Sequence, residues 1–195
     1  MTRAYDWNRM PHLVDVRCPD CRGAATFEFA VAVRIRRKRD IPFFQNHPLF
    51  EYALFDGHAG AGRWHGAIFY AGLHVRGTSA LRKLPDGYSS ADWNHSRYWY
   101  RTHGLDLGTI VCAACHARRK HTLRWPSDAR FQVVYRGHVL WAFNHESAVV
   151  LRDHVASGSR KRSRWSSFLL HVPKPFLTAK ARPEVVKLLD RLLAA

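Results

Sequence analysis

The four cysteines of this 195-residue chain form two Cys-x-x-Cys pairs, Cys18 with Cys21 and Cys112 with Cys115, and no cysteine is left over. Two thiolates separated by two residues can hold one metal ion from a tight turn, and two such turns supply the four sulfurs of a closed tetrahedral Zn²⁺ site. A site of four thiolates has no open coordination position, so its role is structural. We therefore expect one Zn²⁺ that joins two segments lying 90 residues apart in sequence.

Two alternatives use the same residues. The cysteines could instead form two disulfides, but Met1 to Met10 is polar and lacks the apolar core of a secretory signal. No apolar run approaches the roughly 20 residues of a membrane span. These two observations predict a cytoplasmic protein with reduced thiols and no membrane partner. His116 and His121 follow the second pair closely and could each replace a cysteine ligand.

The chain is strongly basic, with 31 Lys and Arg against 15 Asp and Glu and a net charge of +16. Basic proteins of this size commonly bind nucleic acid, because neutralised phosphates release counterions. A generally basic surface without such a partner is the alternative. Three basic runs are the expected contacts to DNA or RNA, and their members are Arg34, Arg36, Arg37, Lys38, Arg39, Arg118, Arg119, Lys120, Arg160, Lys161, Arg162 and Arg164.

Aromatic residues interleave with the charge in two places, Arg97 to Arg101 and Arg162 to Trp165. Such mixtures can stack bases and hold a phosphate backbone at the same time, as proteins that bind single strands do. Packing in the core is the alternative for these aromatic rings.

The segment Cys112-Ala113-Ala114-Cys115-His116, followed by Arg118, Arg119 and Lys120, resembles the C-terminal half of the zinc-bound HNH nucleases. That resemblance implies a metal-binding histidine upstream, usually preceded by Asp, and an Asn shortly before the last cysteine pair. The upstream candidates here are Asp92, Asn94, His95 and His103. No Asp-His pair occurs among them, and Leu107 stands where the family has its Asn.

Periodicity predicts an α+β protein in which a β-rich, zinc-ribbon-like region is interrupted by a long insert and closed by C-terminal helices. Alternating residues predict one half-buried strand from Ala24 to Arg36, and residues 64–75 read as a buried strand. Residues 131–135 and 138–143 predict a hairpin. Asn144 and Gly158 should bound one helix, and a last helix should begin near Pro183.

We divide the chain into four segments that together form one compact unit. They are a first knuckle and strand in 1–39, an aromatic and histidine-rich insert in 40–108, a second knuckle and hairpin in 109–143, and a helical region in 144–195.

These features predict a nucleic-acid-binding protein with structural zinc that acts as an accessory or assembly subunit of a DNA- or RNA-containing complex, alongside other protein subunits. The alternatives are a degenerate HNH-type nuclease and a basic adaptor that meets an acidic protein. The sequence contains no Gly-rich phosphate loop, Gly-x-Ser-x-Gly elbow or His-Glu-x-x-His motif. We therefore assign no catalytic residue and lean against an enzyme.

Overall fold

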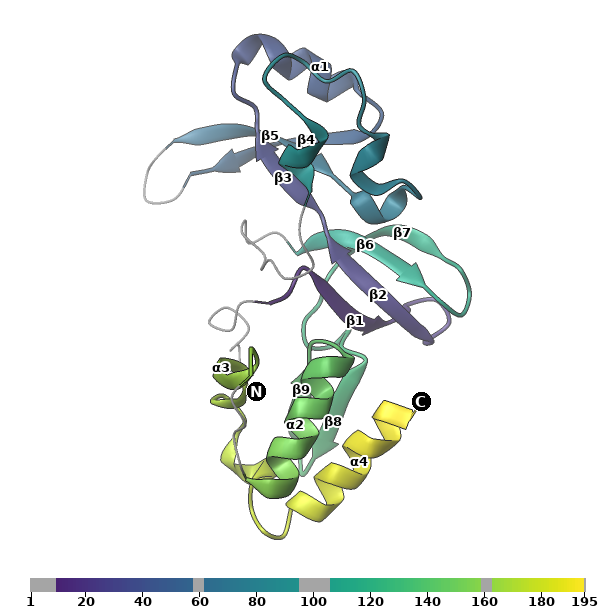
Figure 1. The fold of residues 1–195 in the computed structure, drawn as a ribbon, viewed down its shortest axis with the longest axis vertical. Helices are drawn as coiled ribbons and strands as arrows, with labels where there is room; N and C mark the ends of the chain where they lie inside the picture. The colour runs from purple at the N-terminus through teal and green to yellow at the C-terminus, as the bar shows by residue number, and fades with distance from the viewer. Residues whose placement is uncertain (1–9, 58–61, 95–105, 159–162, 195) are drawn as a thin grey trace.

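The protein is described by a computed structural model that covers residues 10–57, 62–94, 106–158 and 163–194 (Figure 1). It is an α+β fold with antiparallel sheets of four, three and two strands. The four-stranded sheet lies in the middle of the long axis, the three-stranded sheet with helix α1 lies at one end, and the C-terminal helices lie at the other (Figure 1). None of the helices in the described ranges is long and apolar enough to cross a membrane.

The central sheet consists of two hairpins. Strands β1 (Leu13–Arg17) and β2 (Ala24–Phe29) form the first, and strands β6 (Leu107–Cys112) and β7 (Arg118–Thr122) form the second. Pairing of β2 with β6 joins them in the order β1-β2-β6-β7. Phe27 lies opposite both Val14 and Ile110, and all three are fully buried on the face that packs toward the C-terminal region. Each hairpin ends in one cysteine pair.

The prediction of one strand from Ala24 to Arg36 is wrong, because the chain changes sheets in the middle of that segment. Strand β2 ends at Phe29, Ala30 still donates to the carbonyl of Leu107, and β3 (Val31–Arg34) then pairs with β5 in the three-stranded sheet. The apolar alternation of the sequence runs through this change, but burial no longer alternates strictly beyond it, since Val31 and Ala32 are both buried and Val33 is half-buried. Alternation reports an extended backbone and a buried face, but it does not report which strand is the partner.

The three-stranded sheet has the order β3-β5-β4, with β4 spanning Phe50–Asp56 and β5 spanning Arg63–Phe69. Helix α1 (Ile41–Asn46) packs Phe44 against one face, beside the fully buried Trp93.

The predicted strand over 64–75 is too long, since β5 stops at Phe69 and Val75 is 94% exposed. A 3-10 helix, Ala71–Leu73, turns the chain onto β6, where a Cβ on Gly72 would lie 2.9 Å from Thr109 Cβ. Further 3-10 turns are Lys38–Asp40, Gly77–Ala80 and Ser90–Trp93.

The C-terminal region follows its prediction closely. Strands β8 (Phe131–Tyr135) and β9 (His138–Ala142) form the hairpin. Helix α2 (His145–Ser157) begins at Asn144, whose side chain accepts from the backbone N–H of Ser147, and it ends at Gly158 in a left-handed conformation. Short helices follow at Ser166–Leu169 (α3) and Lys174–Phe176. Helix α4 (Arg182–Ala194) packs on α2 and β8.

Candidate metal centre

The two cysteine knuckles have the same backbone structure. Cys18 donates its N–H to the carbonyl of Gly23 at 2.9 Å, and Cys112 donates to the carbonyl of Ala117 at the same distance. In both knuckles the residue after the second cysteine has a positive φ, 63° at Arg22 and 59° at His116. Each turn therefore holds its two thiols on one side of a tight hairpin end, which is the geometry that two ligands from one turn require.

The fold brings the two knuckles together. The sulfur of Cys18 lies 3.8 Å from that of Cys115, and the sulfur of Cys21 lies 3.5 Å from that of Cys112. All four Sγ atoms lie within 4.8 Å of one another. Cys18 and Cys112 are buried at the base of the cluster, whereas Cys21 and Cys115 are exposed. The four cysteines could thus hold one metal ion at the tip of the central sheet.

Proton affinities in the cluster oppose complete ionisation without a cation. The backbone N–H of Cys115, 3.4 Å from the sulfur of Cys112, lowers the pKa of the Cys112 thiol to about 6. The backbone at Ala117 lowers the pKa of Cys115, but hydrogen bonding to its neighbouring sulfurs, that of Cys112 first, outweighs this and raises it to about 12. The Cys112 thiol therefore ionises readily. Its hydrogen bond with the Cys115 thiol then keeps Cys115 protonated. A bound cation would supply the positive charge that releases the remaining protons.

Gly23 allows the two knuckles to approach each other. A Cβ at this position would lie 2.8 Å from Ala114 Cβ, which belongs to the second knuckle, and 3.2 Å from the sulfur of Cys21. The first distance is well below ordinary carbon contacts of about 3.5 Å or more. Only a residue without a side chain leaves room for the sulfurs to meet. The sequence marks Gly23 as a turn residue but does not reveal this contact, because Ala114 lies far away in the chain.

The alternatives for the cysteines do not fit the geometry. All four thiols are free, and their sulfurs are much farther apart than the roughly 2.05 Å of a disulfide bond. His116 occupies the left-handed position of its turn, and it is not among the residues whose ligand atoms meet in the cluster. His121 lies on β7 and its Nε2 is 2.8 Å from Asp128. Within the described residues, the four cysteines are the one group of Cys, His, Asp or Glu side chains that could hold a metal ion.

The predicted basic run at Arg34 to Arg39 lies where β3 leads into α1. Arg34, Arg37 and Lys38 are exposed and form no ion pair within the described residues. Arg36 is engaged within the chain, since it donates to Gly87 and to Asp92. Arg39 lies 3.9 Å from the buried carboxyl of Asp40.

The second basic run occupies β7, on a different sheet from the first. Arg118 donates to the carbonyl of Gly72, and Lys120 pairs with Glu51. Arg119 pairs with Asp20 at 3.0 Å, which gives the two knuckles a contact besides their sulfurs. This run is therefore largely committed to holding neighbouring parts of the fold together.

The third run lies mostly outside the described residues, which exclude Arg160, Lys161 and Arg162. Arg164 is described and forms a two-pronged ion pair with Glu146 at the start of α2. Trp165, beside it, is 5% exposed and packs on Phe143 and Phe168. The ring of Trp165 is thus part of the core, as in the alternative considered for it. The Arg97 to Arg101 segment also lies outside the described residues.

The residues implied by the nuclease resemblance do not converge in the described part of the chain. The carboxylate of Asp92 accepts from the backbone N–H of Ser89 and from Arg36. Asn94 is exposed at the end of a 3-10 turn, and Leu107 lies on β6 beside the three-stranded sheet. His95 and His103 lie outside the described residues.

Comparison with known proteins adds no relative: no family model, no curated protein and no solved structure matches the chain.

Proposed function

We propose that the four cysteines bind one Zn²⁺ and that the protein binds nucleic acid as an accessory or assembly subunit of a DNA- or RNA-containing complex. A Zn–S bond of about 2.3 Å in a tetrahedron places neighbouring sulfurs about 3.8 Å apart. The separations of 3.8 Å and 3.5 Å lie close to that value. Four thiolates suit Zn²⁺ over the harder cations, which prefer oxygen ligands.

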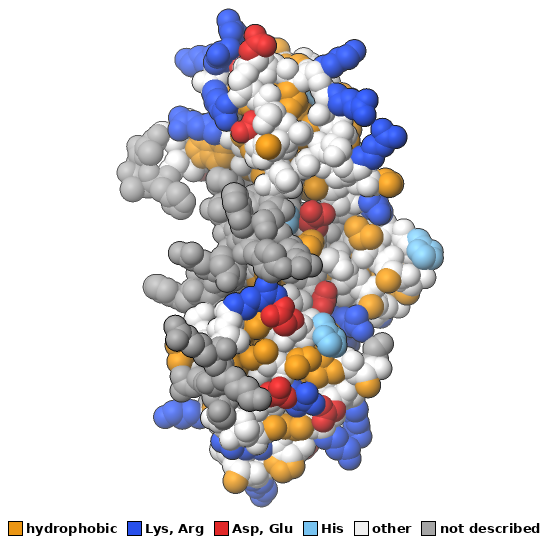
Figure 2. Space-filling view, in the orientation of Figure 1, with side chains coloured by type: hydrophobic (Ala, Val, Ile, Leu, Met, Phe, Trp, Pro, Cys, Tyr) orange, Lys and Arg blue, Asp and Glu red, His pale blue; other side chains and the backbone are white. Residues whose placement is uncertain are grey.

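The observation that carries the nucleic-acid proposal is the run of exposed cations from the last residue of β3 toward the start of α1. Arg34, Arg37 and Lys38 remain available there, while most cations of β7 already have partners within the fold. Arginine can bond two phosphate oxygens at once through its planar guanidinium. Figure 2 shows Lys and Arg side chains gathered at both ends of this face of the molecule. A chain of net charge +16 would add long-range attraction for a polyanion.

The test is binding to single- and double-stranded oligonucleotides over a range of salt concentrations. If phosphates are the main contacts, the logarithm of affinity falls with the logarithm of salt concentration by about 0.9 per contact on duplex DNA and about 0.7 on single strands. Flat salt dependence would contradict the proposal. Identifying nucleic acid that copurifies with the native protein, by its sensitivity to DNase or RNase, separates DNA from RNA.

A matched pair of variants tests where the nucleic acid binds. Replacing Arg34, Arg37 and Lys38 with serine removes three positive charges from the run, and replacing Lys174, Lys180 and Lys187 removes three from the exposed C-terminal region. The first variant should lower affinity for every sequence and reduce the salt slope by about two to three on duplex DNA. The second should change both much less. Equal losses would contradict the assignment of the run.

A further inference from the structure

Strand β7 is an edge strand whose outer side offers backbone hydrogen-bonding groups. Antiparallel pairing alternates between residues that bond to the neighbour and residues that face away from it. The backbone N–H of Cys112 donates to the carbonyl of Ala117, and the N–H of Leu123 donates to the carbonyl of Asp106. Every second residue between Ala117 and Leu123 therefore bonds to β6, and these residues are Arg119 and His121. The N–H and C=O groups of Arg118, Lys120 and Thr122 therefore point outward. Among the residues that the structure describes, no strand pairs with this edge.

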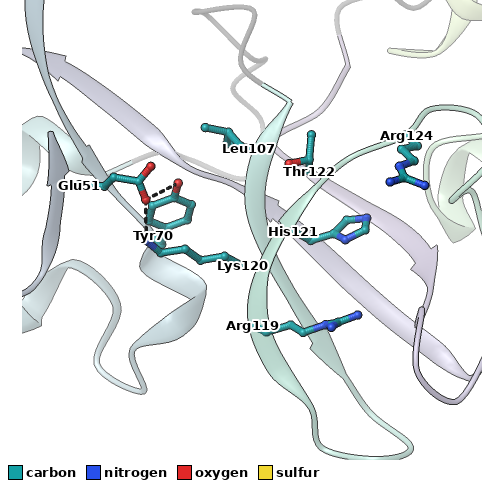
Figure 3. A pocket seen from close by; sticks show the side chains of 8 residues that line it. All are labelled: Glu51, Tyr70, Leu107, Arg119, Lys120, His121, Thr122 and Arg124. Atoms are coloured by element: carbon teal, nitrogen blue, oxygen red, sulfur yellow. Dashed lines mark hydrogen bonds and ion pairs between the residues drawn. The ribbon is translucent and has the colours of Figure 1, made fainter. Parts of the chain in front are cut away.

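A cavity of 370 Å³ lies along this edge (Figure 3). Side chains that point to opposite faces of β7 form its two walls. Tyr70 and Leu107 belong to one wall, where Glu51 accepts from Tyr70 and from Lys120. The other wall consists of Arg119, His121 and Arg124. Arg119 pairs with Asp20 and His121 lies 2.8 Å from Asp128, whereas Arg124 forms no ion pair within the described residues.

We infer that this edge accepts an extended acidic segment of a partner protein as an additional β-strand, with acidic side chains on the side of Arg124 and apolar side chains toward Leu107 and Tyr70. A peptide suits this edge because the edge presents both donors and acceptors, and an extended peptide matches both. Acidic side chains are favoured because Arg119 and Lys120 already pair with Asp20 and Glu51, whereas Arg124 is exposed and forms no ion pair within the described residues. The net charge of +16 adds attraction for an acidic segment. This inference goes beyond the proposed function and does not depend on it.

Two other occupants match the edge less well. A phosphate backbone accepts hydrogen bonds but donates none, so it would leave the outward carbonyls of Lys120 and Thr122 unpaired. A second copy of the chain pairing edge to edge would bring its own Arg-Arg-Lys strand against this one, and opposed like charges destabilise a strand pair.

The test uses the full chain and a capped peptide of alternating Val and Glu, six residues long. Amide hydrogen exchange followed by NMR should show that the peptide slows exchange at Lys120 and Thr122 and leaves His121, already bonded to β6, unchanged. Two further peptides carry N-methyl groups on all valines or on all glutamates. One of them should lose binding and the other should retain it, because only alternate N–H groups of an added strand face β7.

Two variants complete the test. Thr122→Pro removes an outward N–H that the β6 ladder does not use, and edge strands tolerate proline at such positions. Thr122→Val keeps that N–H and serves as the control. We expect about a tenfold loss of peptide affinity for the proline variant and little change for the valine variant.

Binding of both methylated peptides, or no protection of Lys120 and Thr122 at millimolar peptide, would overturn the inference. So would an oligonucleotide that displaces the peptide and loses the same affinity in Thr122→Pro. The methylated peptides decide the question even if the proline variant does not fold.

Discussion

Replacement of Gly23 with alanine should damage the metal centre by pushing the two knuckles apart. The new Cβ would lie 2.8 Å from Ala114 Cβ, about 0.7 Å or more inside ordinary carbon contact. Ala114 Cβ is attached directly to the backbone and cannot rotate away. One knuckle must therefore shift, while the sulfurs need to stay within about 0.2 Å of their positions to hold the ion. Overpacking of this kind costs about 1–3 kcal/mol of unfolding free energy.

The contact provides its own control. Ala114→Gly removes the atom that the new Cβ would meet and should by itself cost no more than about 1 kcal/mol, because it leaves only a more flexible backbone. The double variant Gly23→Ala with Ala114→Gly should then be more stable than the sum of the two single effects predicts. Urea unfolding of all four proteins with zinc present, together with a competition titration for zinc, measures this coupling. Strict additivity of the two substitutions would show that the new Cβ of residue 23 does not meet Ala114 Cβ.

Three further predictions concern other parts of the molecule. Cys112→Ser should lower both zinc content and thermal stability, measured together, because a structural ion contributes folding free energy directly; a stable, zinc-loaded Cys112→Ser protein would contradict this. Burial raises the pKa of Asp15 more than the N–H of His145 and the charge of Arg130 lower it, so the folded state disfavours its ionised form. Asp15→Asn should therefore raise unfolding free energy at pH 7, and the gain should fade as the pH falls below the ordinary aspartate pKa, where both states bind the proton; a constant difference across pH would count against it. Plasmid DNA should stay intact when the protein is incubated with Mg²⁺, Mn²⁺ or Ni²⁺, because the described residues form no second metal site. Metal-dependent cleavage that His95→Ala abolishes would favour the nuclease.

The sequence predicts those parts of the structure that depend on local chemistry. The four cysteines are identifiable as one candidate metal site because two Cys-x-x-Cys pairs have the ligand spacing of such a site. Asn144 and Gly158 mark the ends of α2 because capping needs a side-chain acceptor at one end and a left-handed residue at the other.

Features that depend on partners distant in the chain are not predictable in this way. Nothing near Ala30 indicates that the extended chain leaves the central sheet there, because the choice depends on where β5 and β6 lie. The basic residues of β7 read as free phosphate contacts, but Arg119 and Lys120 meet Asp20 and Glu51, which come from much earlier segments. The function of Gly23 likewise depends on Ala114.

The most direct test of the metal centre is the metal content of the purified protein, measured by elemental analysis and by mass spectrometry under native conditions. We predict one Zn²⁺ per chain, released together with loss of the folded state when a strong chelator is added. A fully folded protein without metal, or one with more than one ion per chain, would contradict it.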